Sequence, residues 1–177
     1  MRVLLLLFVM ALIPFPCVTA QEIFPQDFLG RWQGTLEVFG PDTVLQRVAM
    51  QLHIEPLSDS SYTYTIIYGE ADTGTRAYEL RRGTDGPNHW VVDEKNGILL
   101  DNYFRGGVLT GGFAVMGNLL VASLERRGEA LLYRIVSGKQ APRQTTGGQP
   151  VGGQDIPPVD SYALGGLQQA LLRRVTD

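Results

Sequence analysis

Residues 48–55 of this 177-residue chain read VAMQLHIE, and every even-numbered position in the stretch is apolar. Three of the four odd-numbered positions are polar, so the apolar side chains recur with a period of two. Successive side chains of a β-strand point to opposite faces of its sheet. The period therefore predicts a strand with one face toward a core and one toward water. The stretches 31–39 and 62–68 alternate in the same way.

Short apolar runs continue on both sides of this stretch, from Gly30 to Val136, with turn residues between them. The connectors are only a few residues long, and Asn96-Gly97 is a dipeptide typical of a two-residue hairpin turn. A parallel crossover needs about a dozen residues or more, so we expect antiparallel neighbours. The runs are 31–39, 48–57, 62–68, 76–82, 89–93, 98–104, 108–115, 119–125 and 130–136.

A meander of this length would leave long exposed edges if its sheet stayed open, and closure into a barrel removes those edges. A two-sheet sandwich is the alternative, but its Greek-key crossovers usually need longer connections than this chain offers. The sequence predicts an all-β protein with one antiparallel up-and-down barrel of about 8–10 strands.

The first run opens with Gly30-Arg31-Trp32, followed by Gly34. This pattern resembles the Gly-x-Trp signature of the lipocalins and the wider calycin barrels, over residues 28–136. The resemblance implies that Trp32 closes one end of the barrel and that an arginine from a late strand packs across it. Arg134, in the last predicted strand, is the expected arginine. The Thr-Asp-Tyr turn of typical lipocalins is missing, since residues 101–103 read DNY, and the tail is longer than in that family.

The N-terminus has the features of a secretory signal peptide over residues 1–20. Arg2 precedes an apolar run, and small residues precede a cleavage point after Ala20. The run is shorter than the roughly 20 residues that a membrane-spanning helix needs, although an uncleaved anchor is the alternative. Lipidation at Cys17, the only cysteine, is a second alternative that Pro16 disfavours. Cleavage after Ala20 leaves a chain without disulfides, which favours a periplasmic or secreted bacterial protein.

Beyond the predicted barrel (21–137), the composition changes. Residues 138–160 are rich in Gly, Gln, Thr and Pro, which predicts a flexible linker. Residues 161–177 have a helical spacing of apolar side chains, with Ser161 as the N-cap of a short C-terminal helix. Gly165 and Gly166 would weaken that helix.

Charge and motifs argue against nucleic-acid binding and catalysis. The formal net charge is −3 and the basic residues are scattered, so no positive field for phosphates is expected. His53 and His89 lie in separate runs, and neither a Gly-x-Ser-x-Gly elbow nor a phosphate-binding loop is present. We expect no enzymatic activity, no cofactor and no metal. The carboxylates near Asp93-Glu94 and Glu70 fit solvated turns better than a cation site, because their spacing matches no calcium loop.

Aromatic and methionine side chains are the candidate ligand contacts. A barrel mouth lined by such groups can take a small apolar or amphipathic ligand, although small barrels can also fill their interiors with side chains. The candidate ligand-binding residues are Trp32, Met50, Tyr62, Tyr64, Tyr68, Tyr78, Tyr103, Phe113, Met116 and Arg134. The alternative function is a non-catalytic scaffold whose tail, residues 138–177, recruits a protein partner.

Overall fold

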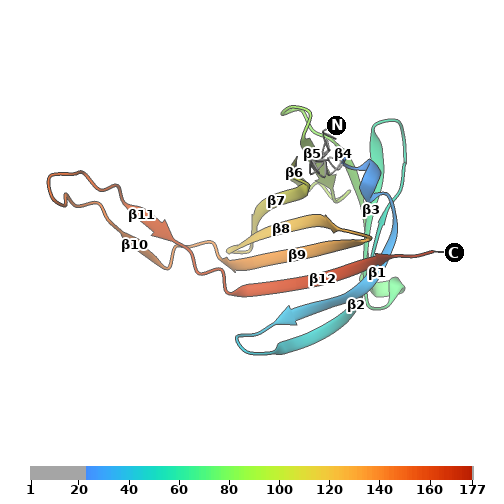
Figure 1. The fold of residues 1–177 in the computed structure, drawn as a ribbon, viewed down its shortest axis with the longest axis horizontal. Helices are drawn as coiled ribbons and strands as arrows, with labels where there is room; N and C mark the ends of the chain where they lie inside the picture. The colour runs from blue at the N-terminus through green and yellow to red at the C-terminus, as the bar shows by residue number, and fades with distance from the viewer. Residues whose placement is uncertain (1–22, 177) are drawn as a thin grey trace, which may run out of the picture.

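Ten antiparallel strands close into one barrel in the computed structural model, which describes residues 23–176 (Figure 1). Consecutive strands pair from β1 to β9, and β12 closes the barrel between β9 and β1. This confirms the predicted all-β barrel over the sandwich. The strands are β1 (Gly30–Phe39), β2 (Val44–Ile54), β3 (Ser61–Tyr68), β4 (Thr75–Arg82), β5 (His89–Asp93), β6 (Leu99–Arg105), β7 (Val108–Val115), β8 (Asn118–Arg127), β9 (Ala130–Lys139) and β12 (Gly166–Arg174).

The alternation in residues 48–55 corresponds to the inner and outer faces of β2. Met50, Leu52 and Ile54 are buried, whereas the intervening Gln51 and His53 are only half-buried. β6 alternates in the same way, with Asn102 and Phe104 buried on either side of the half-buried Tyr103. Residues 1–22, which include the predicted signal peptide and Cys17, lie outside the described residues.

Aromatic rings plug one end of the barrel. The chain enters through the 3-10 helix η1 (Gln26–Phe28), and the ring of Phe24 lies 5.1 Å from those of Phe28, Trp90 and Phe104. Trp32 is buried below this cluster and donates its indole N–H to the Phe28 carbonyl at 3.0 Å. The plug makes this the closed end, and the opposite end carries the β1–β2 and β7–β8 turns. The short helix α1 (Ala71–Gly74) joins β3 to β4 at that opposite end.

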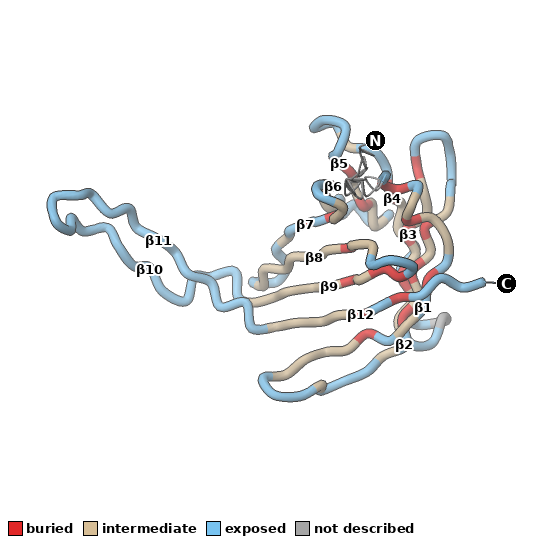
Figure 2. The backbone as a smooth tube through the Cα atoms, viewed as in Figure 1, coloured by how far each residue is buried: buried red, intermediate tan, exposed pale blue. Residues whose placement is uncertain are grey.

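A long arm leaves the barrel between β9 and β12 (Figure 1). Within it β10 (Gln144–Thr146) pairs with β11 (Val159–Ser161), and every residue from 140 to 165 is exposed (Figure 2). The segment predicted as a flexible linker (138–160) therefore contains the end of β9, all of β10 and the first two residues of β11.

The predicted C-terminal helix is wrong, because residues 166–174 form β12. Its residues pair with both β9 and β1, which satisfies the backbone on two sides and overrides the weak helical spacing. Ala170 and Leu172 point into the core, while Leu171 between them is exposed. The barrel thus runs to Arg174 and does not end near residue 137.

No helix among the described residues is both long and apolar enough to cross a membrane.

Candidate ligand-binding cavity

The barrel interior is partly hollow. A cavity of about 200 Å³ lies between β3 and β9, away from the aromatic plug. Its wall is largely apolar and aromatic, with a few polar groups, as expected of a small-molecule site. The residues that line it are Tyr64, Ile66, Tyr68, Arg76, Tyr78, Val92, Glu94, Leu100, Asn102, Gly111, Phe113, Ala122, Tyr133 and Ile135.

Strand parity brings four tyrosines into this cavity. Tyr64 and Tyr68 lie on the inward parity of β3, and Tyr78 on β4 pairs directly with Tyr64. Tyr133 comes from β9 on the other side, and its hydroxyl lies 3.4 Å from that of Tyr68. The interior therefore has a cluster of phenol hydroxyls from strands far apart in the sequence.

Burial raises the pKa values of these phenols further above neutral pH. It raises the pKa of the Tyr64 hydroxyl strongly, and proximity to Tyr68 adds to this. The pKa of Tyr133 is raised well above its ordinary value, again mainly by burial. Burial also raises the pKa of Tyr68, against the opposing hydrogen bond with Tyr133. At neutral pH the cluster thus offers hydroxyl donors and acceptors.

Two charges of opposite sign lie at the edge of the cavity. Arg76 is exposed, whereas Glu94 is half-buried. Both act on Tyr78, whose pKa is raised by burial and by the Glu94 carboxylate and lowered by the Arg76 guanidinium. The cavity therefore has no net charge from these side chains.

Gly111 on β7 makes room for the amide of Asn102. The side-chain N–H of Asn102 donates to the Leu100 carbonyl at 2.8 Å, and its carbonyl oxygen faces Gly111. A Cβ at Gly111 would lie 2.3 Å from that oxygen, which is less than any real contact distance. Glycine is therefore required here by a close approach between strands.

Four of the predicted ligand contacts line the cavity: Tyr64, Tyr68, Tyr78 and Phe113. Sequence reasoning missed Tyr133, although it lies on the same parity as Leu131 and Ile135 in the run 130–136. That parity was the available signal, because both neighbours are apolar.

Three other predicted contacts are buried or packed outside the cavity. Trp32 lies at the closed end, as the Gly-x-Trp resemblance implies, and does not touch the cavity. Met50 is fully buried in the core. Tyr62 packs against Trp90, with ring centres 6.1 Å apart.

The last three predicted contacts are on the outside of the barrel. Tyr103 stacks on His89 at 4.8 Å and donates to the Asp85 carboxylate at 2.6 Å. Met116 is 94% exposed in the β7–β8 turn. Arg134 binds the Gln169 side chain at 3.0 Å, so it is not the arginine that packs across the tryptophan.

That arginine is Arg174 on β12. Its guanidinium carbon lies 4.4 Å from the centre of the Trp32 ring. The assignment to Arg134 was wrong because β12, and not β9, is the last strand of the barrel.

The remaining polar groups fit structural roles. His89 is buried, and its ring nitrogens bond the Asp85 backbone N–H and the Asp101 carboxylate, both at 2.9 Å. In the β5–β6 turn the backbone N–H of Lys95 donates to Asp93 at 2.8 Å. Among residues 23–176 no group of three or more His, Cys, Asp or Glu side chains is placed to hold a metal ion.

Comparison with known proteins gives no family. No protein-family model matches the sequence, and no curated protein matches it. Among solved structures, the chain is similar to a mutant of the fluorescent protein UnaG, with a TM-score of 0.47 and 14% identity over 86% of this chain and 99% of that one. The pairing of the chain's own strands closes the antiparallel barrel.

Proposed function

We propose that this protein binds a small apolar or amphipathic molecule inside its barrel and is not an enzyme. The observation that carries the proposal is the cavity of about 200 Å³, lined by aromatic and aliphatic side chains, in an otherwise well-packed core. A polar cluster on one wall gives such a ligand an orientation.

The cavity volume limits the size of the ligand. An apolar cavity of roughly 150 Å³ is large enough for benzene. A cavity of about 200 Å³ therefore fits a ligand of about one ring or a short alkyl chain. Longer molecules would extend past Arg76 and Glu94 into solvent.

The test is retention of a small molecule by the purified full chain, measured by native mass spectrometry after incubation with a cell extract. Ala122→Leu fills the cavity from β8 and should abolish retention, whereas Ala114→Leu, at an exposed position on the adjacent β7, should not. Absence of any adduct from the unmodified protein, or equal adducts in both variants, would contradict the proposal.

We also propose that the protein is exported by a bacterial cell and acts in the periplasm or outside. The support is the pattern of residues 1–20 and the lack of any other cysteine beyond Cys17. Mass spectrometry of the intact protein recovered from the periplasm or medium tests this. We expect the mass of a chain that begins at Gln21. A mass that corresponds to a lipid on Cys17 would show a lipoprotein, and retention of the full chain in the cytoplasm would contradict export.

A second candidate function is recruitment of a protein partner by the arm. The supporting observation is its full exposure, including the apolar side chains of Val151, Val159 and Tyr162. Because Ser137 pairs with Gly166, a short turn in place of residues 141–164 leaves β9 and β12 paired. Loss of a co-purifying partner with unchanged ligand retention would assign recruitment to the arm.

A further inference from the structure

We infer that the ligand carries an uncharged polar group, a hydroxyl or carbonyl, which is held by the hydroxyls of Tyr64, Tyr68 and Tyr133. This inference rests on the proposed function, and it names the class of ligand: alcohols, phenols, aldehydes or ketones in preference to carboxylates.

The hydroxyls of Tyr68 and Tyr133 have bonding capacity to spare. Their oxygens are 3.4 Å apart, whereas a hydroxyl pair usually lies about 2.7–2.8 Å apart. Each hydroxyl has one donor hydrogen and two acceptor lone pairs, so a single long bond leaves most of this capacity unused. A ligand hydroxyl can accept from one phenol and donate to the other, and a ligand carbonyl oxygen can accept from both.

Tyr64 adds a hydroxyl without a partner in the protein. The residue is 7% exposed, and its hydroxyl makes no hydrogen bond to any other residue in 23–176. Every polar side-chain atom of the described chain that is fully enclosed has a hydrogen-bond partner. Because the Tyr64 hydroxyl has none, it is not fully enclosed, and the open space next to it is the cavity that Tyr64 lines. A buried hydroxyl of this kind gains when a ligand supplies the missing bond.

The charges around the cavity disfavour an anionic ligand group at this cluster. Arg76 and Glu94 are the only charged side chains among its described lining residues, and their opposite charges at the edge offset one another. The one cation near the phenols, Arg76, is exposed, and its effect on the Tyr68 phenol is smaller than that of burial. A carboxylate beside the three phenols would therefore lose its hydration for a weak, screened attraction, which is costly. The same environment disfavours a negative charge on the phenols, because burial raises the pKa of Tyr133.

The experiment compares alcohols with carboxylates of the same chain length, from butanol and butyrate to decanol and decanoate, by calorimetry on the full chain at about pH 7. Carboxylic acids of this kind are ionised there. We expect the alcohols to bind at least about tenfold more tightly than their matched carboxylates, since a buried unpaired charge costs more than about 1.4 kcal/mol.

Single hydroxyl deletions locate the contact. Tyr68→Phe and Tyr133→Phe should each weaken alcohol binding about three- to tenfold, the value of one hydrogen bond. Tyr62→Phe, outside the cavity, is the matched control and should leave it unchanged. Thermal unfolding of each variant shows whether the fold is kept.

The outcomes separate the two proposals. Carboxylates that bind as tightly as alcohols, or alcohol binding that is unaffected by both cavity variants, would overturn the inference and leave barrel binding in place. If no member of either series binds, and no adduct is retained from an extract, the proposed function fails and the inference with it.

Discussion

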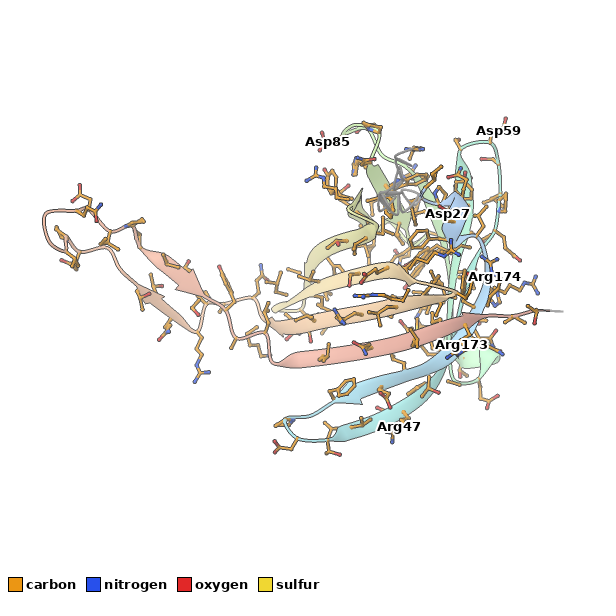
Figure 3. The ribbon with its side chains drawn as sticks, in the orientation of Figure 1. Asp27, Arg47, Asp59, Asp85, Arg173 and Arg174 are labelled. Atoms are coloured by element: carbon orange, nitrogen blue, oxygen red, sulfur yellow. The ribbon has the colours of Figure 1, made fainter. Side chains whose placement is uncertain are left out.

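Arg174 covers the indole ring of Trp32, with 4.4 Å between the guanidinium carbon and the ring centre, and the two residues face each other across β12 and β1. The pair joins the last strand of the barrel to the first at its closed end. Arg173 and Arg174 lie side by side at the end of β12 (Figure 3), but they point to opposite faces of the strand by parity.

Arg174→Ala should therefore lower the free energy of unfolding by about 0.5–2 kcal/mol, the range for a cation above an aromatic face. Arg173→Ala is the matched control and should change it by less than about 0.5 kcal/mol. Urea unfolding followed by tryptophan fluorescence measures both. Equal effects in the two variants would mean that Arg174 contributes only its surface charge.

Gly111→Ala should destabilise the protein by about 1–3 kcal/mol, because the new Cβ would meet the Asn102 amide oxygen at 2.3 Å and the Asp101 carbonyl at 2.9 Å. Gly112→Ala is the control: its Cβ would have no neighbour nearer than the Leu120 carbonyl at 3.9 Å. Thermal denaturation of the two variants is the measurement. A neutral Gly111→Ala would show that β6 and β7 can separate locally.

Removal of residues 166–177 should abolish cooperative folding. The loss of β12 leaves β1 and β9 with unpaired edges and takes Ala170 and Leu172 from the core. Replacement of the arm alone, residues 141–164, should leave the melting transition nearly unchanged. Near-ultraviolet circular dichroism of both chains distinguishes a barrel from a collapsed state, and a native-like spectrum without β12 would refute the assignment of this strand.

Stability should fall in alkali. The pKa values of Tyr64, Tyr68 and Tyr133 are raised in the folded state, so above about pH 10 the unfolded chain loses these protons first. Below about pH 10 each of these tyrosines contributes fully to the free energy of unfolding. Above it, the contribution of each tyrosine falls by roughly 1.4 kcal/mol per pH unit, until the pH reaches the pKa of that tyrosine in the folded state. Urea unfolding at several alkaline pH values measures the slope. Tyr64→Phe should make it shallower, and an unchanged slope would mean that this phenol ionises freely.

Strand parity could be predicted from the sequence, and the inward tyrosines of β3 and β4 follow from it. The aromatic ring of Tyr103 makes it a candidate by residue type, but its neighbours Asn102 and Phe104 are the buried pair in that strand. Arg134 likewise lies on the outward parity of β9, between the buried Tyr133 and the half-buried Ile135. Parity was thus a better guide to the cavity than residue type.

The last strand could not be identified in this way. Leu167, Leu171 and the alanine at 170 have a spacing that suits a helix, and only the open edges of β1 and β9 select the extended form. Those edges are tertiary structure, which no local pattern contains. The hollow interior was also beyond the sequence, since the same side chains could have filled it.

Closure by β12 has a consequence for biosynthesis. Trp32 pairs with Arg174, so the cylinder is incomplete until the chain as far as Arg174 has left the ribosome. Until β12 is in place, the nascent chain keeps the edges of β1 and β9 exposed, and exposed strand edges are what chaperones shield from aggregation.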